Sequence, residues 1–328
     1  MKTGAPTTAS TSTLSARHLL RWLLAVQALA AGLIAWAVAG LFGIPAALAL
    51  LCGLACVILV RLAISANNFA MSRRLGSVTP ERHQLHVLQR LRLFAEEFAS
   101  SMLYTSWFIP RGSARMRLHP ANGIAPVVLL HGYGCNSGYW SHLIPLLEAA
   151  GISHASIDLE PLTAAIDDYV PQVARGIDAL CAASGAGQVL VIAHSMGGLV
   201  ARAYLRAHGA SRIAHIITLG TPHHGTALAD LGPGRNAVQM RLLAANTWLQ
   251  ALAASETLAT RALITSIYTH HDNIVVPQTS GELPGARNLD IGGVGHVALA
   301  RNTRVLALVV DEIVMMFRTQ NNVWQRHR

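Results

Sequence analysis

The sequence predicts an α/β fold, in which a mostly parallel sheet is flanked by helices and preceded by a transmembrane helical hairpin and an amphipathic connector. Three observations predict it. Residues 22–60 form a run of 39 positions without a charged residue. From about residue 120, short apolar runs of strand type alternate with longer helical segments. One of these runs, at 189–193, ends beside a serine at which a helix begins.

The composition excludes a disordered chain and differs from that of an ordinary soluble protein. Only 12% of the 328 residues are charged and 52% are hydrophobic, whereas soluble proteins have about 25% charged residues. A globular domain joined to membrane-embedded sequence fits these values. The net charge is +9, and residues 1–111 hold 10 of the 25 basic residues but 3 of the 16 acidic ones. Positive charge that flanks an apolar run indicates a membrane as partner, and not nucleic acid.

A Gly-Ile-Pro turn at 43–45 divides the uncharged run into residues 22–42 and 45–60. A helix rises 1.5 Å per residue, so the first segment covers about 31 Å and the second about 24 Å. The first length crosses a bilayer and the second is marginal. We therefore expect a transmembrane hairpin at 19–61, with spans at about 22–42 and 45–60, after a disordered tail at 1–18.

Basic residues flank this run on both sides. They are Arg17 and Arg21 before it, and Arg61, Arg73, Arg74, Arg82, Arg90 and Arg92 after it. The positive-inside rule then places both ends of the hairpin, and the domain that follows, on the cytoplasmic side. Two alternatives stay open. One is a signal peptide cleaved near Ala-Val-Ala at 37–39, and the other is a single span with an exported domain.

Residues 62–111 form a juxtamembrane connector that contains an amphipathic pattern at 80–103. Its apolar residues recur every three or four positions: Leu85, Leu88, Leu91, Phe94, Phe98 and Met102. This spacing predicts a helix with one apolar stripe. The stripe either packs on the following domain or lies on the lipid interface.

The remaining residues, 112–328, predict one domain. Strands are expected at 127–130, 155–159, 189–193, 213–219, 263–269 and 287–290, and helices at 143–150, 169–183, 196–208 and 303–317. Continuous apolar strands that alternate with helices indicate a parallel sheet covered on both faces.

The strand–serine–helix segment marks Ser195 as a candidate nucleophile. A turn this tight needs small residues two positions before and after the serine, and Ala193 and Gly197 meet that need. The helix that begins at Met196 offers a free amide where an oxyanion would form. The alternative is that Ser195 serves only as a helix N-cap.

A His-Gly-Tyr-Gly loop follows the strand at 127–130. We expect the amide of Tyr133 to complete an oxyanion hole with the amide of Met196, and His131 and Gly132 to line the substrate cleft. A glycine turn without a catalytic role is the alternative.

A serine nucleophile needs a base and an orienting acid, in the chain order serine, acid, histidine. His296 lies in a glycine-rich loop between the last strand and the last helix, so it is the candidate base. Asp272 follows a strand end and is the favoured acid, with Asp290 as its rival.

His223 and His224 follow the strand at 213–219, and we expect them to line the cleft. No acidic residue is spaced to make a metal site with them, so no metal is predicted. No cofactor is predicted either, because the sequence has no GxGxxG or P-loop string.

Five strings together resemble the bacterial lipases of the α/β-hydrolase superfamily: HGYG at 131–134, AHSMGG at 193–198, LGTPHHGT at 219–226, HDNIVVP at 271–277 and GARNLDIGGVGH at 285–296. The serine turn and the last two strings are similar to the Bacillus-type lipases, and GTPHHGT to the Pseudomonas and Burkholderia type. The resemblance covers about residues 124–317. It implies an α/β-hydrolase fold and ester hydrolysis, with Ser195 as nucleophile, His296 as base and Asp272 as orienting acid.

Two departures from these lipases matter. The larger ones carry a calcium-binding carboxylate just after the catalytic histidine, but residues 297–301 contain no acid. An extra segment at about 227–258 is predicted to form a small apolar cap over the cleft, or else to pack as ordinary helices. Its apolar residues are Met240, Leu242, Leu243, Trp248, Leu249 and Leu252.

These features predict a membrane-anchored serine ester hydrolase that acts on a lipid or small ester substrate, as a multi-pass protein of the bacterial inner membrane. An acyltransferase or phospholipase with the same three residues is one alternative. A non-catalytic membrane scaffold that retains the fold is another. The oligomeric state is left open.

Overall fold

A computed structural model describes residues 15–242 and 246–326 of the chain, so most of the predicted tail at 1–18, and Leu243, lie outside the described residues. Seven strands form one sheet in the order β1-β3-β2-β4-β5-β6-β7, parallel throughout except for the pair β1 and β3. They are β1 (Met116–Arg117), β2 (Val127–Leu130), β3 (His154–Ile157), β4 (Val189–His194), β5 (Ile213–Leu219), β6 (Ile264–Thr269) and β7 (Arg287–Ile291). The predicted mostly parallel sheet is confirmed. The short β1 was not predicted, because two exposed residues give no periodic signal.

The helices follow the predicted alternation with the strands. They are α1 (Ala16–Phe42), α2 (Ala46–Leu75), α3 (Val87–Leu103), α4 (Ile109–Arg111), α5 (Ile144–Ala149), α6 (Ile166–Ser184), α7 (Met196–His208), α8 (Arg235–Gln239), α9 (Thr247–Ala254), α10 (Leu258–Ala262) and α11 (Thr303–Arg326). Short helical turns complete the list: η1 (Glu81–His83), η2 (Tyr104–Phe108), η3 (Ser137–Trp140), η4 (Ala227–Leu231), η5 (Gln278–Gly281) and η6 (Val297–Ala300).

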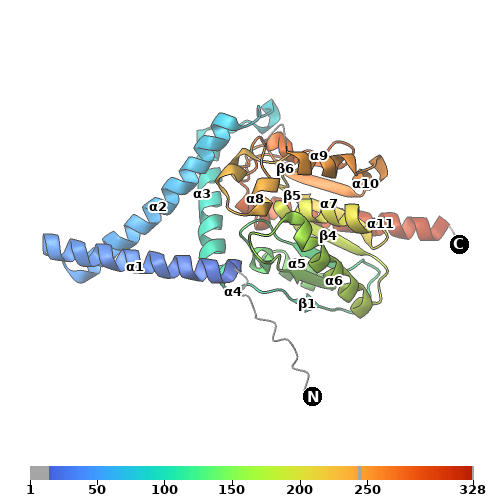
Figure 1. The fold of residues 1–328 in the computed structure, drawn as a ribbon, viewed down its shortest axis with the longest axis horizontal. Coiled ribbons are helices and arrows are strands. Elements are labelled where there is room, and N and C mark those ends of the chain that lie inside the picture. Colours follow the sequence, from blue (N-terminus) through green and yellow to red (C-terminus); the bar gives the residue numbers. More distant parts are fainter. Residues whose placement is uncertain (1–14, 243–245, 327–328) are drawn as a thin grey trace, which may run out of the picture.

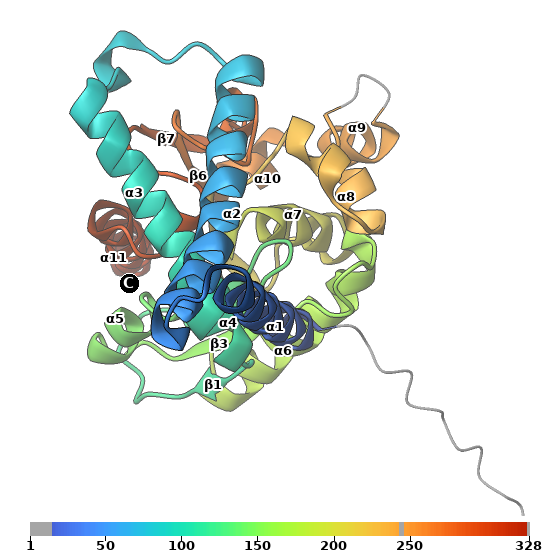
Figure 2. The same cartoon turned by 90° about the vertical axis from the view of Figure 1, so that its left-hand side faces the viewer.

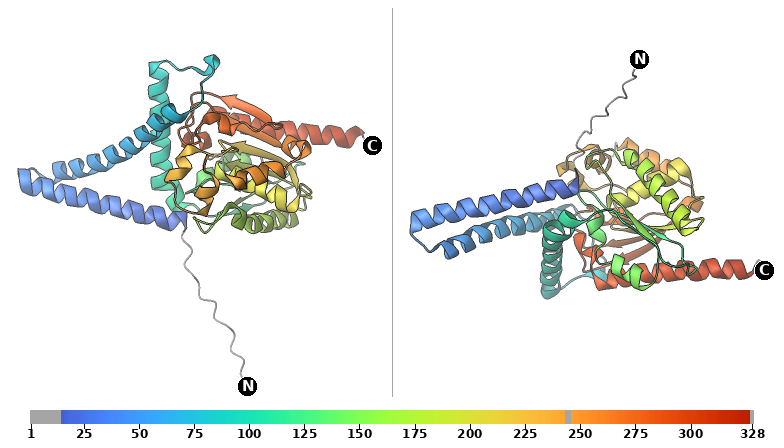
Figure 3. Two further views of the ribbon diagram at one scale, coloured as in Figure 1. Left: turned by 45° about the horizontal axis from the view of Figure 1, so that its top comes forward. Right: turned by 90° about the horizontal axis from the view of Figure 1, so that it is seen from below.

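Each face of the sheet has its own hydrophobic core. Helices α6, α7 and α9 pack on one face in a cluster that includes Val191 and Leu199. Helices α5 and α11 cover the other face, with Leu129 and Val309 in the cluster. The right panel of Figure 3 shows the sheet between these layers. Burial on both sides explains why the central strands are apolar at every position.

Helices α1 and α2 form a hairpin that projects away from the sheet domain (Figure 1). Both are long and apolar enough to cross a membrane, and their most apolar windows are only 6% and 11% buried. The two helices approach closely at small residues, because a Cβ on Gly53 would lie 2.1 Å from the carbonyl oxygen of Ala31. Small residues at such contacts are typical of membrane helix pairs. Large apolar side chains such as Trp36 point outward, with 79% of that residue exposed.

Helix α2 continues to Leu75, 15 residues beyond the uncharged run, and its polar end reaches the sheet domain. Helix α3 lies between the projecting hairpin and the sheet domain (Figure 1) and runs beside α2 (Figure 2). Its buried residues are Leu93, Glu97 and Ser100, whereas Leu88 is 70% exposed. Helix α3 therefore packs on the domain, but through a face that contains Glu97 and not through the whole apolar stripe predicted at 80–103.

Candidate active site

Ser195 lies in the turn between β4 and α7, with φ 54° and ψ −124°. Among the described residues, it is the only one other than glycine with a positive φ. The turn is tightly enclosed, because a Cβ on Gly197 would lie 2.5 Å from the carbonyl oxygen of Leu130, and one on Gly132 would lie 2.9 Å from Cβ of Ser195. Such strain persists only where the surroundings hold it, and it is concentrated at functional sites.

Asp272 and His296 form a buried pair beyond the ends of β6 and β7. Oδ2 of Asp272 lies 2.8 Å from Nδ1 of His296. The other carboxylate oxygen, Oδ1, accepts hydrogen bonds from the amides of Ile274 and Val275, at 2.8 and 2.7 Å. The amide of His296 donates to Oδ1 of Asn273 at 3.0 Å. Both side chains of the pair are therefore fixed in orientation.

Charge favours a proton on His296. Burial alone would lower the pKa of His296, but the charge and hydrogen bond of Asp272, together with the charge of Glu97, raise it above its ordinary value. When the ring is neutral, its Nδ1–H donates to Asp272 and Nε2 keeps a lone pair. This is the protonation state that a general base requires.

The serine turn and the Asp272–His296 pair meet around Gly220. The amide of Ser195 donates to the carbonyl of Leu219, the residue before Gly220, at 2.9 Å. A Cβ on Gly220 would lie 3.2 Å from Nδ1 of His296 and 3.3 Å from Oδ2 of Asp272. Within the described part of the chain, no hydrogen bond joins the hydroxyl of Ser195 to His296. In enzymes without a bound substrate, such bonds are often longer than in the working complex.

The two residues predicted to form an oxyanion hole follow neighbouring strands of the sheet. Met196 is the first residue of α7, a position where the amide has no acceptor within the helix. Tyr133 follows β2, the direct neighbour of β4 in the sheet. The Tyr133 hydroxyl donates to the carbonyl of Pro233 at 2.6 Å, which anchors this loop to the segment after η4.

The predicted cleft histidines do not share one location. His131 is 1% exposed, and its Nε2 accepts from the amide of Leu159 at 2.9 Å. His223 is 2% exposed and contacts Ser266 Oγ at 3.2 Å. Both side chains are enclosed to a similar degree as Asp272 and His296, so their place in a substrate cleft stays a prediction. His224 is exposed, and its Nε2 lies 3.1 Å from the carbonyl oxygen of Glu282. Gly132 packs directly against Ser195.

The rival acid, Asp290, belongs to another cluster. Its Oδ2 lies 3.0 Å from Nε2 of both His83 and His270, and it also pairs with Arg82. Burial alone would raise the pKa of Asp290, but hydrogen bonds from His270, Arg82 and His83 lower it to about 2. Nε2 of His83, Nε2 of His270 and the carboxylate of Asp290 could together hold a metal ion, but the guanidinium of Arg82 already pairs with this carboxylate and supplies the positive charge. More than 200 positions separate His83 from Asp290, so no local pattern predicts this cluster.

The segment predicted as a cap contributes several side chains to the core where it is described. Met240, Leu249 and Leu252 are buried in the core on the α7 side of the sheet. Nε1 of Trp248 donates to Oδ2 of Asp167 on α6 at 2.8 Å. These buried residues therefore belong to the core of the sheet domain, and the cap at 227–258 stays a prediction.

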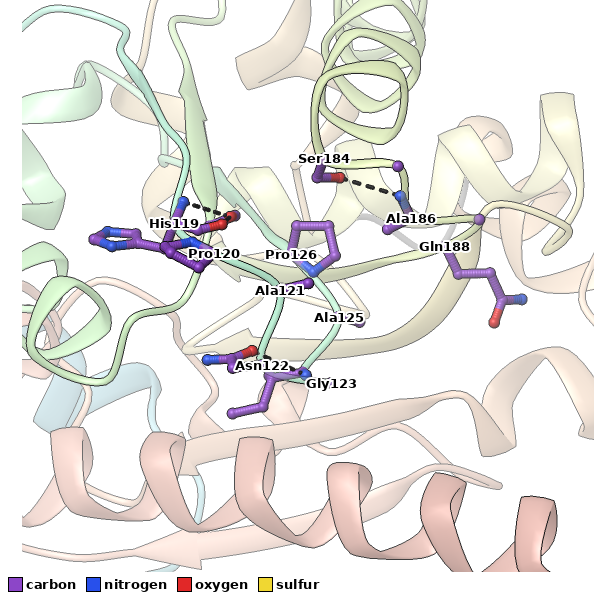
Figure 4. A pocket seen from close by; sticks show the side chains of 14 residues that line it. His119, Pro120, Ala121, Asn122, Gly123, Ala125, Pro126, Ser184, Ala186 and Gln188 are labelled. Atoms are coloured by element: carbon purple, nitrogen blue, oxygen red, sulfur yellow. Dashed lines mark hydrogen bonds between the residues drawn. The ribbon is translucent and has the colours of Figure 1, made fainter.

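Two cavities in the described part of the chain lie apart from Ser195. One, of about 570 Å³, is at the opposite edge of the sheet and is lined by the segments before β2 and β4 (Figure 4). Another, of about 400 Å³, lies between α2, α3 and the loop after β6, where Ser72 and Gln278 line it. Ser72 Oγ donates to the carbonyl of Asp272 at 2.9 Å, so this second cavity adjoins the loop that carries the acid.

Sequence reasoning missed one buried acid, Glu97. It is 2% exposed and accepts hydrogen bonds from the amides of Val297 and Ala298, directly after His296. Its position four residues after Leu93 and three before Ser100 places all three on one helical face, but an acid in an amphipathic helix is normally solvated, so this spacing does not predict its burial. The residues after His296 do not fit a calcium site, because 297–301 contain no acid and both oxygens of Glu97 are bound to amides.

The comparisons with known proteins concern the sheet domain. Residues 125–242 match the α/β hydrolase fold family. A triacylglycerol lipase of Pseudarthrobacter phenanthrenivorans is 32% identical over 116 residues, which are 32% of this chain and 35% of that protein. A triacylglycerol lipase of Burkholderia plantarii is also 32% identical over 116 residues, or 31% of its length. The chain thus spans about a third of the curated relatives it matches.

Solved structures agree on the fold. A Bacillus licheniformis lipase in its mature form has a TM-score of 0.54 at 19% identity, covering 61% of this chain and 97% of that one. Aspergillus fumigatus lipase B has a TM-score of 0.52 at 20% identity, covering 62% and 56%. The α/β-hydrolase fold is confirmed, and so is the resemblance of this domain to bacterial lipases.

Proposed function

We propose that the chain is a membrane-anchored serine ester hydrolase that cleaves lipid-like carboxylic esters. The observation that carries the proposal is the strained Ser195 at the same edge of the sheet as the buried Asp272–His296 pair. The lipase relatives support ester hydrolysis.

In the proposed reaction, Ser195 Oγ attacks the ester carbonyl while Nε2 of His296 takes its proton. Asp272 holds the ring and stabilises the imidazolium that forms. The amides of Met196 and Tyr133 stabilise the oxyanion of the tetrahedral intermediate. His296 then protonates the leaving alcohol, and water attacks the acyl-enzyme in a second, equivalent cycle that frees Ser195.

The test is a comparison of Ser195→Ala with the wild type as purified full-length protein in detergent. We expect hydrolysis of p-nitrophenyl esters to fall by about 10³-fold or more, because the nucleophile is lost. Ser184→Ala is the matched control, since Ser184 lies at the end of α6 and lines the cavity at the opposite edge. Equal activity in the wild type and Ser195→Ala would refute the mechanism and favour the scaffold alternative.

A lipid alcohol added to the same assay separates hydrolysis from acyl transfer. Hydrolysis predicts free acid as the product at every acceptor concentration. An acyltransferase would form the new ester at the expense of the acid, with the same dependence on Ser195.

Membrane anchoring is part of the proposal, supported by the two apolar helices and their exposed side chains. Helices α2 and α3 contact the loops that carry Asp272 and His296, and the hairpin projects from this side of the sheet domain (Figure 1). An ester dissolved in the bilayer would then approach from the hairpin side. With the positive-inside rule, we propose a multi-pass protein of the bacterial inner membrane with a cytoplasmic catalytic domain. Protease added to inverted vesicles should digest that domain, whereas digestion in right-side-out spheroplasts would contradict this orientation.

A further inference from the structure

We propose that Glu97 is a positioning residue for His296, so that the connector helix α3 completes the active site of the sheet domain. This inference rests on the proposed function, because it assigns Glu97 to the loop of the proposed base. It does not make Glu97 a reacting group. The carboxylate acts through the backbone on either side of His296.

The first observation is a pair of hydrogen bonds. Oε1 of Glu97 accepts from the amide of Val297 at 3.0 Å, and Oε2 accepts from the amide of Ala298 at 2.9 Å. These are the first two residues of η6, whose amides have no acceptor within the turn. A carboxylate at that place satisfies both donors and complements the positive end of the turn. The turn begins at His296, so Glu97 fixes the direction in which the backbone leaves that residue.

The second observation is the fit on the other side of His296. A Cβ on Gly295 would lie 2.5 Å from Oε2 of Glu97 and 2.6 Å from its carboxyl carbon. Only glycine leaves room for the acid at this distance. Glu97 therefore contacts the residue before His296 and hydrogen-bonds the two residues after it. Removal of this side chain would leave a cavity and two buried donors without an acceptor beside the base.

The third observation extends the support to Asp272. Ser72, near the end of α2, donates to the carbonyl oxygen of Asp272 at 2.9 Å. Nε2 of Gln278 donates to the same carbonyl at 2.8 Å. The two helices that connect the hairpin to the domain thus hold both loops of the pair. Gln278 donates to the same carbonyl as Ser72 and could hold the Asp272 loop without it. The amides of Val297 and Ala298 have Glu97 as their acceptor.

Glu97 also has an electrostatic effect on His296. Burial raises the pKa of Glu97, while the amides of Val297 and Ala298 and the nearby His296 oppose that rise. In its ionised form, the side chain favours the imidazolium that His296 becomes during the reaction. A residue that only stabilised the fold would not change the titration of His296.

The experiment compares Glu97→Ala and Glu97→Gln with the wild type, all as full-length protein in detergent. Glu96→Gln is the matched control, because Glu96 is the neighbour on α3 and its carboxylate binds the side chain of Asn302 instead, at 2.8 Å. Three quantities are measured: kcat and KM for a p-nitrophenyl ester, the pH midpoint of kcat/KM, and hydrogen exchange in a peptide that covers residues 290–302.

We expect Glu97→Ala to lower kcat by about 10- to 100-fold with KM changed less than about twofold, since a small displacement of a reacting group has that effect. The pH midpoint should fall and exchange at 290–302 should rise. Glu97→Gln keeps one acceptor oxygen and should lie between Glu97→Ala and the wild type. Glu96→Gln should match the wild type in all three measurements.

Unchanged hydrogen exchange at 290–302 in Glu97→Ala would overturn the proposal. A kcat of Glu97→Ala equal to that of the wild type would overturn it as well. If instead the wild type shows no hydrolysis that depends on Ser195, the proposed function fails. The exchange measurement still decides whether Glu97 holds the His296 loop.

Discussion

Oδ2 of Asp272 lies 2.8 Å from Nδ1 of His296, and neither residue is more than 3% exposed. The amides of Ile274 and Val275 bind the other oxygen of the same carboxylate. Asp272 therefore connects the backbone after β6 to the ring in the loop after β7. The carboxylate orients the ring of His296 through this hydrogen bond, and its negative charge raises the pKa of the same ring.

The substitution Asp272→Asn removes the charge and keeps the shape. The amide cannot stabilise the imidazolium, and its NH₂ group cannot accept from an amide or hold the ring in the required tautomer. We expect kcat to fall by about 10⁴-fold while the protein stays folded. Steady-state kinetics with a p-nitrophenyl ester and a thermal unfolding curve measure both. Asp290→Asn is the control, because Asp290 binds Arg82, His83 and His270. Equal losses in the two variants would contradict the assignment of Asp272.

The pH dependence of kcat/KM should follow His296. The base works only when neutral, so activity rises as pH increases through the pKa of His296. Because Asp272 and Glu97 raise that pKa, the acid-side midpoint should lie above the ordinary histidine value of about 6.5. Loss of either negative charge favours the neutral ring and should shift the midpoint to lower pH. A profile from pH 5 to 9 checks this, and a wild-type midpoint below about 6 would contradict it.

Local patterns in the sequence predicted the elements that are buried along their whole length. The strand at 127–130 and the turn at Ser195 depend on neighbouring residues, so spacing alone identified them. Glu97 and Val297 are 200 positions apart. No local pattern signals a contact over that distance, and an acid inside an amphipathic helix is normally solvated. The side chain of His223, at a strand end, can face either the cleft or the interior, and spacing alone does not decide between them.

A buried ion pair fixes α7 to the segment after α9. Nε and Nη2 of Arg202 donate to the two carboxylate oxygens of Glu256 at 2.6 and 2.9 Å, and both side chains are at most 2% exposed. Arg202→Met would leave Glu256 with Arg261 as its remaining partner. We expect a loss of about 3 kcal/mol in the free energy of unfolding, because the partly exposed Arg261 compensates the buried charge of Glu256 only in part. Denaturant titration in detergent measures it. Arg212→Met, which removes an exposed contact to Asp178 at 3.8 Å, should change little, and a similar loss there would contradict this account.

A substitution at Gly220 can distinguish the effect of backbone strain from the effect of displacing His296. Its φ is 55°, and an added Cβ would lie 2.7 Å from Leu299 Cδ1 and 3.2 Å from Nδ1 of His296. Gly220→Ala should therefore displace the base as well as strain the chain. Gly185→Ala is the matched control, because Gly185 has φ 73° at the end of α6 and no atom within 4 Å of its added Cβ.

Both alanines carry a left-handed backbone cost of about 1–2 kcal/mol, which unfolding curves measure. Only Gly220→Ala should also lower kcat, by about 100-fold, because its methyl group moves His296 relative to Ser195. Because both variants carry a similar backbone cost, a difference between their kcat values reports the displacement of the imidazole. A kcat for Gly220→Ala equal to that of Gly185→Ala would mean that the loop absorbs the methyl group without moving the ring. In that case, the packing around Gly220 would not determine where His296 lies.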